Sequence, residues 1–358
     1  MPRHRQGADR AAWSWLADHG RHRGVALDVR LIGRFASAFA RLIALLAFVA
    51  LCAFLLAKLS PIDPVDAYLG PAIGRVGEAQ RAAIAAAWGL DRPWPTQFLL
   101  WLGNLLSGDA GYSLSYNAPV AEVIAARAGP SLALAGTSWL LSSLIGFMLG
   151  ILAGVYEDTA LDRIVRGWSF VLASTPTFWL AILMLTVFSV GLGWAPLCCA
   201  GPIGVRPQDV SLSQALAHLA LPLLTLTLFG VAQIALHTRA KAIVIMRSDH
   251  VRFAFAQGAG RVDIAIRHVA RNAALPGIAL MLASIGELFG GAMLAEQVFA
   301  YPGLGRAAVD AGLQGDVPLL LAITLLTAFV VGLGGMAARL VAKTVDPRLR
   351  NADLAVAP

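Results

Sequence analysis

The stretch RSDHVRFAFAQGAGRVDIAIRHVARNAALP, residues 247–276, is a basic segment set between two long apolar stretches. It contains five arginines and two histidines, spaced among small and apolar residues. A loop that only joined two helices would need about two to eight residues. We therefore predict that this segment is an ordered docking element, held between helices that the flanking apolar residues form.

The composition is that of a membrane protein. The chain has 358 residues, of which 58% are hydrophobic and only 14% are charged, with a mean hydropathy of +0.70. A soluble protein carries about 25% charged residues. In a membrane protein, a net charge of +7 first reports topology. The basic residues are not interleaved with a soluble aromatic platform, so we predict no binding of nucleic acid.

Six stretches are long and apolar enough to cross a bilayer, which predicts an all-α, polytopic membrane fold with six transmembrane helices. They cover about residues 35–59, 131–155, 167–193, 214–236, 274–299 and 318–342. Pro176 breaks the third stretch and Pro222 the fourth, which a helix bundle tolerates. Pro276 and Pro318 are predicted to lie at helix starts, where a missing N–H costs nothing. The six-span domain would occupy residues 35–342.

Lysines and arginines fall mainly on one side of these spans. With the N-terminus inside, the cytosolic segments hold 20 of them and the external segments 6, which predicts cytoplasmic N- and C-termini. Residues 1–34 form a basic cytoplasmic extension, and residues 343–358 a cytoplasmic tail. Eight arginines precede or begin the first span, so we predict an uncleaved anchor and not a signal peptide.

Residues 60–130 form the largest polar region on the predicted external side. Helical patterns cover Glu78–Trp88 and Trp94–Leu106, and the turn-forming residues 89–93 separate them. The tryptophans of this region suit a position at the membrane surface. They are Trp88, Trp94 and Trp101.

The three cysteines do not predict a disulfide framework. Cys52 lies inside the first span and is expected to be a small packing residue. Cys198 and Cys199 are adjacent in a predicted external loop. Neighbouring cysteines seldom bridge, and no histidine or further cysteine completes a metal site. We therefore predict ordinary loop thiols.

Sequence patterns for phosphate binding and for hydrolytic or redox chemistry are missing from the chain. It contains no GxxxxGKS/T, HExxH, GxSxG or CxxC. We predict that the chain is not an enzyme, needs no cofactor or metal, and takes the energy for any active transport from another chain. The alternative to a transport protein powered by another chain is an ion-coupled transporter, which would need several acids within the membrane. A membrane-embedded enzyme is a second, but no paired catalytic residues support it.

The docking element is predicted to be a helix, a bend and a second helix. Residues 240–256 contain no helix breaker, and Gly258 and Gly260 end that helix. A second short helix covers residues 261–272. Its apolar stripe is expected to be Val262, Ile266 and Val269, and its charged face to contain the pair Asp263 and Arg267.

Residues 249–258 and 267–276 together resemble the cytoplasmic coupling loop of ABC-importer permeases in the dipeptide, oligopeptide and nickel family. Other family-like segments follow in order between residues 36 and 350. They are Asp63–Val65, Gly89–Pro93, Trp101–Asp109, Gly111–Ser113, Thr175–Trp179, Val298–Gly305 and Asp346–Arg348. Four residues depart from the family pattern: Gln257 stands for a lysine, Phe253 and Phe255 are bulkier than usual, and Gly260 replaces a helix-capping serine.

The resemblance implies the fold of a type I (MetI-like) ABC-importer permease in the bacterial inner membrane. It implies four kinds of partner: a second homologous permease, two cytosolic ATPases, an extracytoplasmic solute-binding protein and membrane lipid. Di- or oligopeptides are the expected substrate, with nickel or another small solute as the alternative. Within the cytoplasmic segment 237–273 it assigns ATPase coupling to ten residues. They are Asp249, Val251, Arg252, Ala254, Gln257, Gly258, Arg267, His268, Arg271 and Asn272.

Glu287 falls near the middle of the predicted fifth span. A carboxylate there costs about 2.5–3.5 kcal/mol on insertion scales. Two interpretations stay open: a protonated or hydrogen-bonded group packed against another helix, or a residue of the substrate path that faces cationic groups. Glu296, nearer the outer end, is expected to be an ordinary interface residue.

The remaining polar clusters are expected to be structural. His250 and His268 lack a second ligand nearby, so they are assigned to docking or structure and not to a metal. Glu157, Asp158 and Asp162 are expected to form a solvated turn. The YPGLG sequence at residues 301–305 is expected to be a turn that faces the external mouth.

Overall fold

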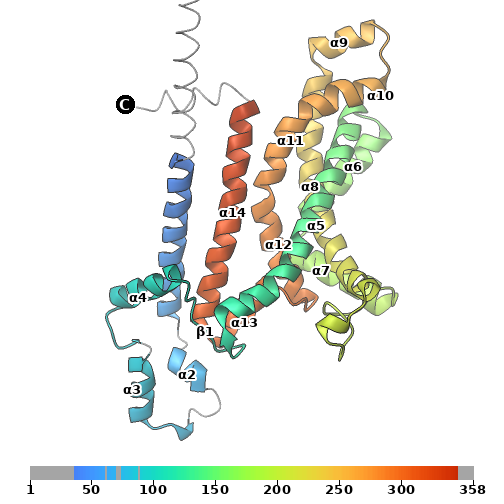
Figure 1. Ribbon diagram of the computed structural model, residues 1–358. Helices are drawn as coiled ribbons and strands as arrows, with labels where there is room; N and C mark the ends of the chain where they lie inside the picture. Colours follow the sequence, from blue (N-terminus) through green and yellow to red (C-terminus); the bar gives the residue numbers. More distant parts are fainter. Residues whose placement is uncertain (1–35, 61–62, 70–73, 88, 346–358) are drawn as a thin grey trace, which may run out of the picture. The chain divides into compact units, whose positions relative to one another are not determined.

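The computed structural model describes residues 36–60, 63–69, 74–87 and 89–345, and these are mainly helical, with one short antiparallel pair of strands, β1 (Tyr112–Ser113) and β2 (Ala118–Pro119) (Figure 1). The chain divides into two units, residues 1–48 and 49–358. The predicted N-terminal extension, Trp88, Asp346–Arg348 and most of the C-terminal tail lie outside the described residues. The α-helices before the docking element are Ala36–Leu59, α2 (Pro64–Leu69), α3 (Glu78–Ala87), α4 (Trp94–Leu106), α5 (Val120–Val155), α6 (Ala160–Ala173), α7 (Thr177–Met184) and α8 (Leu212–Met246). After it come α11 (Arg271–Ala283), α12 (Ile285–Val298), α13 (Leu304–Gln314) and α14 (Val317–Val345).

The described helices give four to six candidate spans against the six predicted, and some boundaries differ. Four of them are long and apolar enough to cross a membrane, and two bent pairs bring the number to six if each pair is one span. The first pair is α6 with the segment Thr177–Gly191, bent by 104°, and the second is Arg261–Ala283 with α12, bent by 44°. The predicted break at Pro176 is confirmed, because Pro176 lies between the helices of the first pair.

The second span begins earlier than predicted. Helix α5 starts at Val120 and not near residue 131, and Pro130 lies inside it. Val120 and Val123 are buried against α13 and α14, so tertiary packing stabilises the extra turns. At 36 residues the helix is about 54 Å long, which exceeds the ~30 Å hydrocarbon core. Part of the predicted external region is therefore the first turns of this helix.

Three glycines at intervals of four residues bring α5 and α8 into close contact. A Cβ atom added at Gly146 would lie 2.8 Å from Ile234, at Gly150 2.5 Å from Thr238, and at Gly154 2.4 Å from Ala242. This spacing places the glycines on one helix face, and small residues there let two backbones approach closely. The sequence contains this signal, GxxxGxxxG, although the span predictions did not use it.

The prediction of a solvated acidic turn is wrong for Asp162, which is buried, whereas Glu157 is partly exposed and Asp158 is exposed. Asp162 is 0% exposed and accepts hydrogen bonds from Arg239 Nε at 2.5 Å and Arg239 Nη2 at 2.7 Å. It also accepts one from the backbone N–H of Asp158, whose φ is 62°. The carboxylate thus closes the turn and joins α6 to α8. Glu157 keeps a half-exposed position and pairs with Arg247 at 2.8 Å.

Glu296 is likewise a buried anchor and not an ordinary interface residue. It is 1% exposed and accepts hydrogen bonds from Ser131 Oγ at 2.5 Å and from the Gly305 N–H at 2.6 Å. A Cβ atom at Gly303 would collide with its carboxyl group. The residues around this carboxylate, Tyr301 and Leu304 among them, are buried. The 301–305 turn therefore wraps a carboxylate inside the protein.

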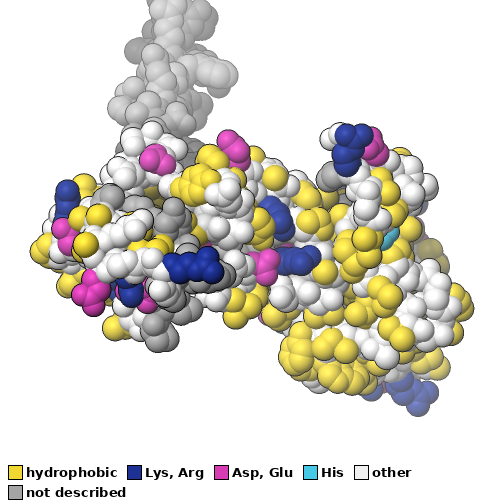
Figure 2. Space-filling model, turned by 90° about the horizontal axis from the view of Figure 1, so that it is seen from below, with side chains coloured by type: hydrophobic (Ala, Val, Ile, Leu, Met, Phe, Trp, Pro, Cys, Tyr) yellow, Lys and Arg dark blue, Asp and Glu magenta, His cyan; other side chains and the backbone are white. Residues whose placement is uncertain are grey.

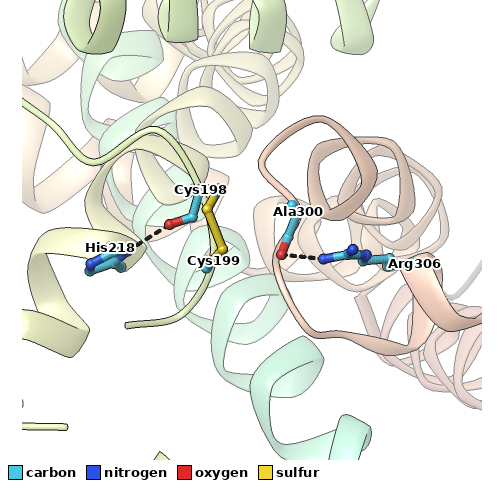
Figure 3. The surroundings of a disulfide bond; sticks show 5 residues. All are labelled: Cys198, Cys199, His218, Ala300 and Arg306. Atoms are coloured by element: carbon cyan, nitrogen blue, oxygen red, sulfur yellow. Dashed lines mark hydrogen bonds between the residues drawn. A yellow bond between two sulfur atoms is a disulfide. The ribbon is translucent and has the colours of Figure 1, made fainter. Parts of the chain in front are cut away.

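Cys198 and Cys199 form a disulfide, so the prediction of two free loop thiols was wrong (Figure 3). His218 Nδ1 donates a hydrogen bond to the Cys198 carbonyl oxygen at 2.7 Å. The Cys199 N–H donates to the Phe299 carbonyl oxygen at 2.9 Å. Cys199 has a φ of 75°, a conformation that non-glycine residues adopt only when their surroundings hold them there. The two anchors, on α8 and after α12, supply those surroundings.

We expect thiol alkylation of the denatured, unreduced protein to modify Cys52 alone, because Cys52 is the free cysteine in the structure. After reduction, the reagent should modify all three cysteines. Mass spectrometry of the peptides that contain each residue gives the readout, with Cys52 as the internal control. Modification of Cys198 or Cys199 before reduction would contradict the assigned bridge.

Large apolar side chains cover much of the described surface, as expected for a protein that faces lipid. Leu140, Leu144 and Met148 on α5 are 61%, 57% and 55% exposed. On the face drawn in Figure 2, hydrophobic side chains spread widely, and charged groups of both signs stand singly or in small clusters. Among the described residues on that face, no extended patch of one charge is visible.

Candidate docking segment

The predicted first helix of the docking segment is two helices. Helix α8 ends at Met246, and α9 covers Asp249–Ala256. Ser248 separates them with an extended backbone, φ −76° and ψ 154°, and its hydroxyl donates to the Ile245 carbonyl oxygen at 2.5 Å. Serine side chains that bond to nearby backbone compete with helix continuation, and Asp249 favours the start of a new helix. The prediction of one helix over residues 240–256 was therefore wrong.

The bend at the glycines is confirmed. Gly258 has φ +88°, a left-handed conformation that glycine adopts without strain. Gly260 has φ −76° and is the N-cap of α10 (Arg261–Ile264), at the place where relatives were expected to have a capping serine. The turn between α9 and α10 therefore needs a glycine at residue 258, whereas residue 260 has a backbone conformation that any residue can adopt.

The second helix continues past Asn272, where it was predicted to end. Helix α10 passes into the π-helical turn η4 (Ala265–Ala270) and then into α11, which ends at Ala283. Pro276 lies inside α11 and not at a helix start. Ala273 and Gly277 on either side of it are buried, so packing against other helices outweighs the hydrogen bond that proline removes. The docking segment is therefore directly continuous with the fifth span.

The π-helical turn also changes which residues are buried. Val262 and Ile266 are 64% and 66% exposed, whereas Val269 is 0% exposed, so the three do not form one stripe. Ile264 and Val269, five residues apart, are both fully buried. A π-helix is wound more widely than an α-helix, because its hydrogen bonds join residue i to i+5, so residues five apart lie closer to one face. The predicted stripe assumed an α-helical period and was wrong for that reason.

The inward side of the segment is anchored in a cluster of buried apolar side chains, called here the anchor cluster. Its members come from the ends of α5 and α8, from α9 and from the helix that follows the bend. They are Ile151, Val155, Ala242, Ile245, Val251, Ala254, Ile264, Ala265, Val269 and Ala273. Figure 1 shows α9 and α10 beside the ends of α8, α5 and α11. A displacement of α9 would therefore act on several long helices at once.

The ten residues predicted for coupling separate into three groups by burial. Val251 and Ala254 belong to the anchor cluster and are 0% and 7% exposed. His268 is partly buried, and its ring centroid lies 6.1 Å from that of His250. The other seven side chains or backbones are exposed at the surface of the segment. They are Asp249, Arg252, Gln257, Gly258, Arg267, Arg271 and Asn272.

The charged groups of the segment form local ion pairs at the surface. The predicted pair is confirmed, with Arg267 Nε 2.6 Å from Asp263, and Arg252 lies 3.7 Å from Asp249. Exposed pairs of this kind contribute about 0–1 kcal/mol each, so they orient side chains more than they stabilise the fold. Among the described residues, no group of three or more His, Cys, Asp or Glu side chains could hold a metal ion.

The exposed side of the docking segment also carries apolar side chains, which were not among the ten residues predicted for coupling. Phe253 is 64% exposed, and Val262 and Ile266 are exposed to the same degree. Exposed apolar groups with charged neighbours are typical of a protein-contact surface. The unusual size of Phe253 was the sequence signal that could have placed it there. We call Phe253, Val262, Ile266, Arg252 and Arg267 the outer surface.

Glu287 does not join this segment. It lies in the first turn of α12, directly after the break at Ser284, and its side chain is exposed.

Residues 146–351 match the family described as "binding-protein-dependent transport system inner membrane component". The match covers more than half of the chain and contains the whole docking segment. The chain belongs to this family. As a member of these inner membrane components, it is a multi-pass membrane protein of a transport system, in agreement with its fold and with the predicted class.

Several relatives of this inner membrane component align over most of its length. A Brucella suis protein named as a peptide permease is 36% identical over 298 residues, which are 83% of this chain and 92% of the relative. The oligopeptide transport system permease protein AppB of Bacillus subtilis is 31% identical, with 84% and 94% covered. The glutathione transport system permease protein GsiC of Salmonella choleraesuis is 33% identical, with 86% and 96% covered.

Proposed function

We propose that the chain is the permease subunit of an ATP-driven, binding-protein-dependent importer of di- or oligopeptides. Its family membership and the names of its relatives support the transport class and the substrate class. The chain has no phosphate-binding loop, so ATP hydrolysis is assigned to separate ATPase subunits. Residues 249–272 are the element that docks to them.

The anchor cluster is the observation that carries the docking assignment. On one side of α9, Val251 and Ala254 pack against residues of α5, α8 and the helix after the bend. On the other side, Phe253 is exposed next to charged residues. A segment with one buried and one exposed side can receive a force at its surface and pass it to the spans.

The remaining partners follow from the transport class. A second, similar permease is assigned to the other half of the translocation path, and an extracytoplasmic solute-binding protein to the opposite side of the membrane from α9. The excess of Lys and Arg around α9 supports a cytosolic position for it, with both termini also in the cytosol. In this scheme, closure of the ATPase dimer moves α9, and the spans alternate between inward-open and outward-open states.

The Gly258 turn allows a direct test of coupling. We expect Gly258→Ala to reduce peptide uptake by at least about tenfold, because a Cβ atom disfavours φ +88° and the turn between α9 and α10 must change. The protein should still insert into the membrane. Uptake and peptide-stimulated ATP hydrolysis are measured in proteoliposomes that contain the complete importer.

Gly260→Ala is the matched control. It adds the same methyl group two residues away, where φ is −76° and no atom lies within 4 Å of the new Cβ. Uptake should stay within about twofold of the parent, because no backbone strain arises there. Equal effects of the two substitutions, or normal uptake in Gly258→Ala, would contradict the role of this turn in docking.

A further inference from the structure

Two carboxylates on α12 have opposite surroundings. Glu296 is 1% exposed and is held by Ser131 and by the N–H groups of Gly305 and Arg306. Glu287 is exposed and, within the part of the chain that the structure describes, has no hydrogen-bond or ion-pair partner. Contacts within the chain therefore account for the burial of Glu296 but give no structural role to Glu287.

The two residues adjacent to Glu287 in sequence, Gly286 and Leu288, both face neighbouring helices. A Cβ atom at Gly286 would lie 3.0 Å from Val331 of α14. Leu288 is 2% exposed, and its Cδ2 atom lies 3.2 Å from the Cβ position of Gly230 on α8. Glu287 lies between these two contacts, on the remaining face of the helix. That face of α12 is a stripe of exposed positions at helical spacing, namely Glu287, Gly290, Leu294 and Gln297.

This stripe differs from a surface that faces lipid. From Leu140 to Leu152, the exposed residues of α5 are all large and apolar, with Leu140, Leu144 and Met148 as examples. The stripe on α12 has one large apolar residue, Leu294, beside Glu287, Gly290 and Gln297, and a Cβ atom at Gly290 would meet no atom within 4 Å. An ionised carboxylate that faced lipid would be costly, and such residues usually face water-filled or protein-lined cavities.

Glu287 also lies about half the thickness of a hydrocarbon core away from the end of α12. Eleven residues separate it from Val298, the end of α12, which is about 16 Å of helix at 1.5 Å per residue. Half of the hydrocarbon core is about 15 Å. Substrate sites of transporters commonly lie at this depth, next to breaks in helices, and α11 and α12 meet at such a break.

We infer that Glu287 lines the translocation path and binds the terminal ammonium group of a passing peptide. This inference rests on the proposed peptide-import function. An importer for peptides of many sequences can rely only on groups that all of them share, which are the backbone and the two termini. A carboxylate complements the positive terminus, and it forms a charge-assisted hydrogen bond with an ammonium group.

The test compares uptake of two peptides that differ only in acetylation of the N-terminus. The complete importer is reconstituted with its binding protein and ATPases, and the peptide pair is chosen so that the binding protein binds both members. The readout is the ratio of uptake rates, free to acetylated, in the parent, Glu287→Gln and Glu287→Asp. The preference of the binding protein, and the amount of folded transporter, cancel when these ratios are compared.

We expect the ratio to fall about tenfold in Glu287→Gln, the effect of losing one charge-assisted contact, and to stay within about twofold of the parent in Glu287→Asp. An unchanged ratio in Glu287→Gln would overturn the inference. So would an equal loss of uptake for both peptides, which is the result expected if Glu287 packs against the second permease. If the parent importer takes up neither peptide, the proposed function itself fails, and this inference fails with it.

Discussion

Gly150→Leu should prevent α5 and α8 from packing and should leave almost no folded protein. The Cβ atom alone would lie 2.5 Å from Thr238 Cβ and 2.7 Å from the Ala235 carbonyl oxygen. The second contact is with backbone, so a change of side-chain rotamer cannot relieve it. Overpacking by single methylene groups already costs about 1–3 kcal/mol, and a leucine adds four carbon atoms. The measurement is the amount of monodisperse protein that elutes after detergent extraction, together with its thermal midpoint.

Gly136→Leu is the matched control on the same helix. Gly136 is exposed, and an added Cβ atom would meet nothing within 4 Å. Leucine also has a higher helix propensity than glycine, by about 0.8 kcal/mol. We expect a yield and a thermal midpoint equal to or above those of the parent. If Gly150→Leu were as stable as Gly136→Leu, the close crossing of α5 and α8 would be wrong.

Asp162→Ala should destabilise the protein by about 3–5 kcal/mol, the cost of removing one partner from a buried ion pair. Asp162 is 0% exposed and the Arg239 side chain is 15% exposed, so little water would replace the lost carboxylate. The Asp158 N–H would lose its hydrogen-bond acceptor as well. Denaturant titration of the purified protein gives the change, and the α5–α6 turn should open first.

Asp209→Ala serves as the comparison because it removes an exposed ion pair. Asp209 lies 2.9 Å from Arg206, and their side chains are 50% and 73% exposed. An exposed pair contributes only about 0–1 kcal/mol. The double substitution Asp162→Ala with Arg239→Met should recover part of the stability, since it removes the unpaired charge. Similar destabilisation by Asp162→Ala and Asp209→Ala would contradict the buried pair.

Local patterns in the sequence predicted the parts of the fold that depend on neighbouring residues. Apolar runs located the spans, and the pattern from Trp94 to Leu106 gave the bounds of α4. The i,i+4 pair Asp263–Arg267 and the bend at Gly258 were also predicted. Each of these features depends on residues within a few positions of one another, which is why the sequence was sufficient.

The errors concern contacts between distant residues or a change in helix period. Asp162 accepts a hydrogen bond from Arg239, which is 77 positions away, and Glu296 accepts one from Ser131, which is 165 positions away. Because these partners are distant in sequence, both acids were predicted to be more exposed than they are. The π-helical turn at Ala265–Ala270 shifted the buried face of the docking segment. The backbone of Cys198 and Cys199 is hydrogen-bonded to His218 and Phe299, which are distant in sequence and could not be predicted from the loop itself.

Photo-cross-linking from the outer surface tests the central proposal, that α9 contacts an ATPase subunit. Cys52, Cys198 and Cys199 are first replaced by alanine in an importer that still transports. A benzophenone maleimide is then attached to Phe253→Cys or, as a control, to Leu212→Cys, an exposed position at the opposite end of α8. We predict an ATPase adduct from Phe253→Cys and none from Leu212→Cys. No adduct from Phe253→Cys in a complex that hydrolyses ATP, or an equal adduct from Leu212→Cys, would contradict the docking assignment.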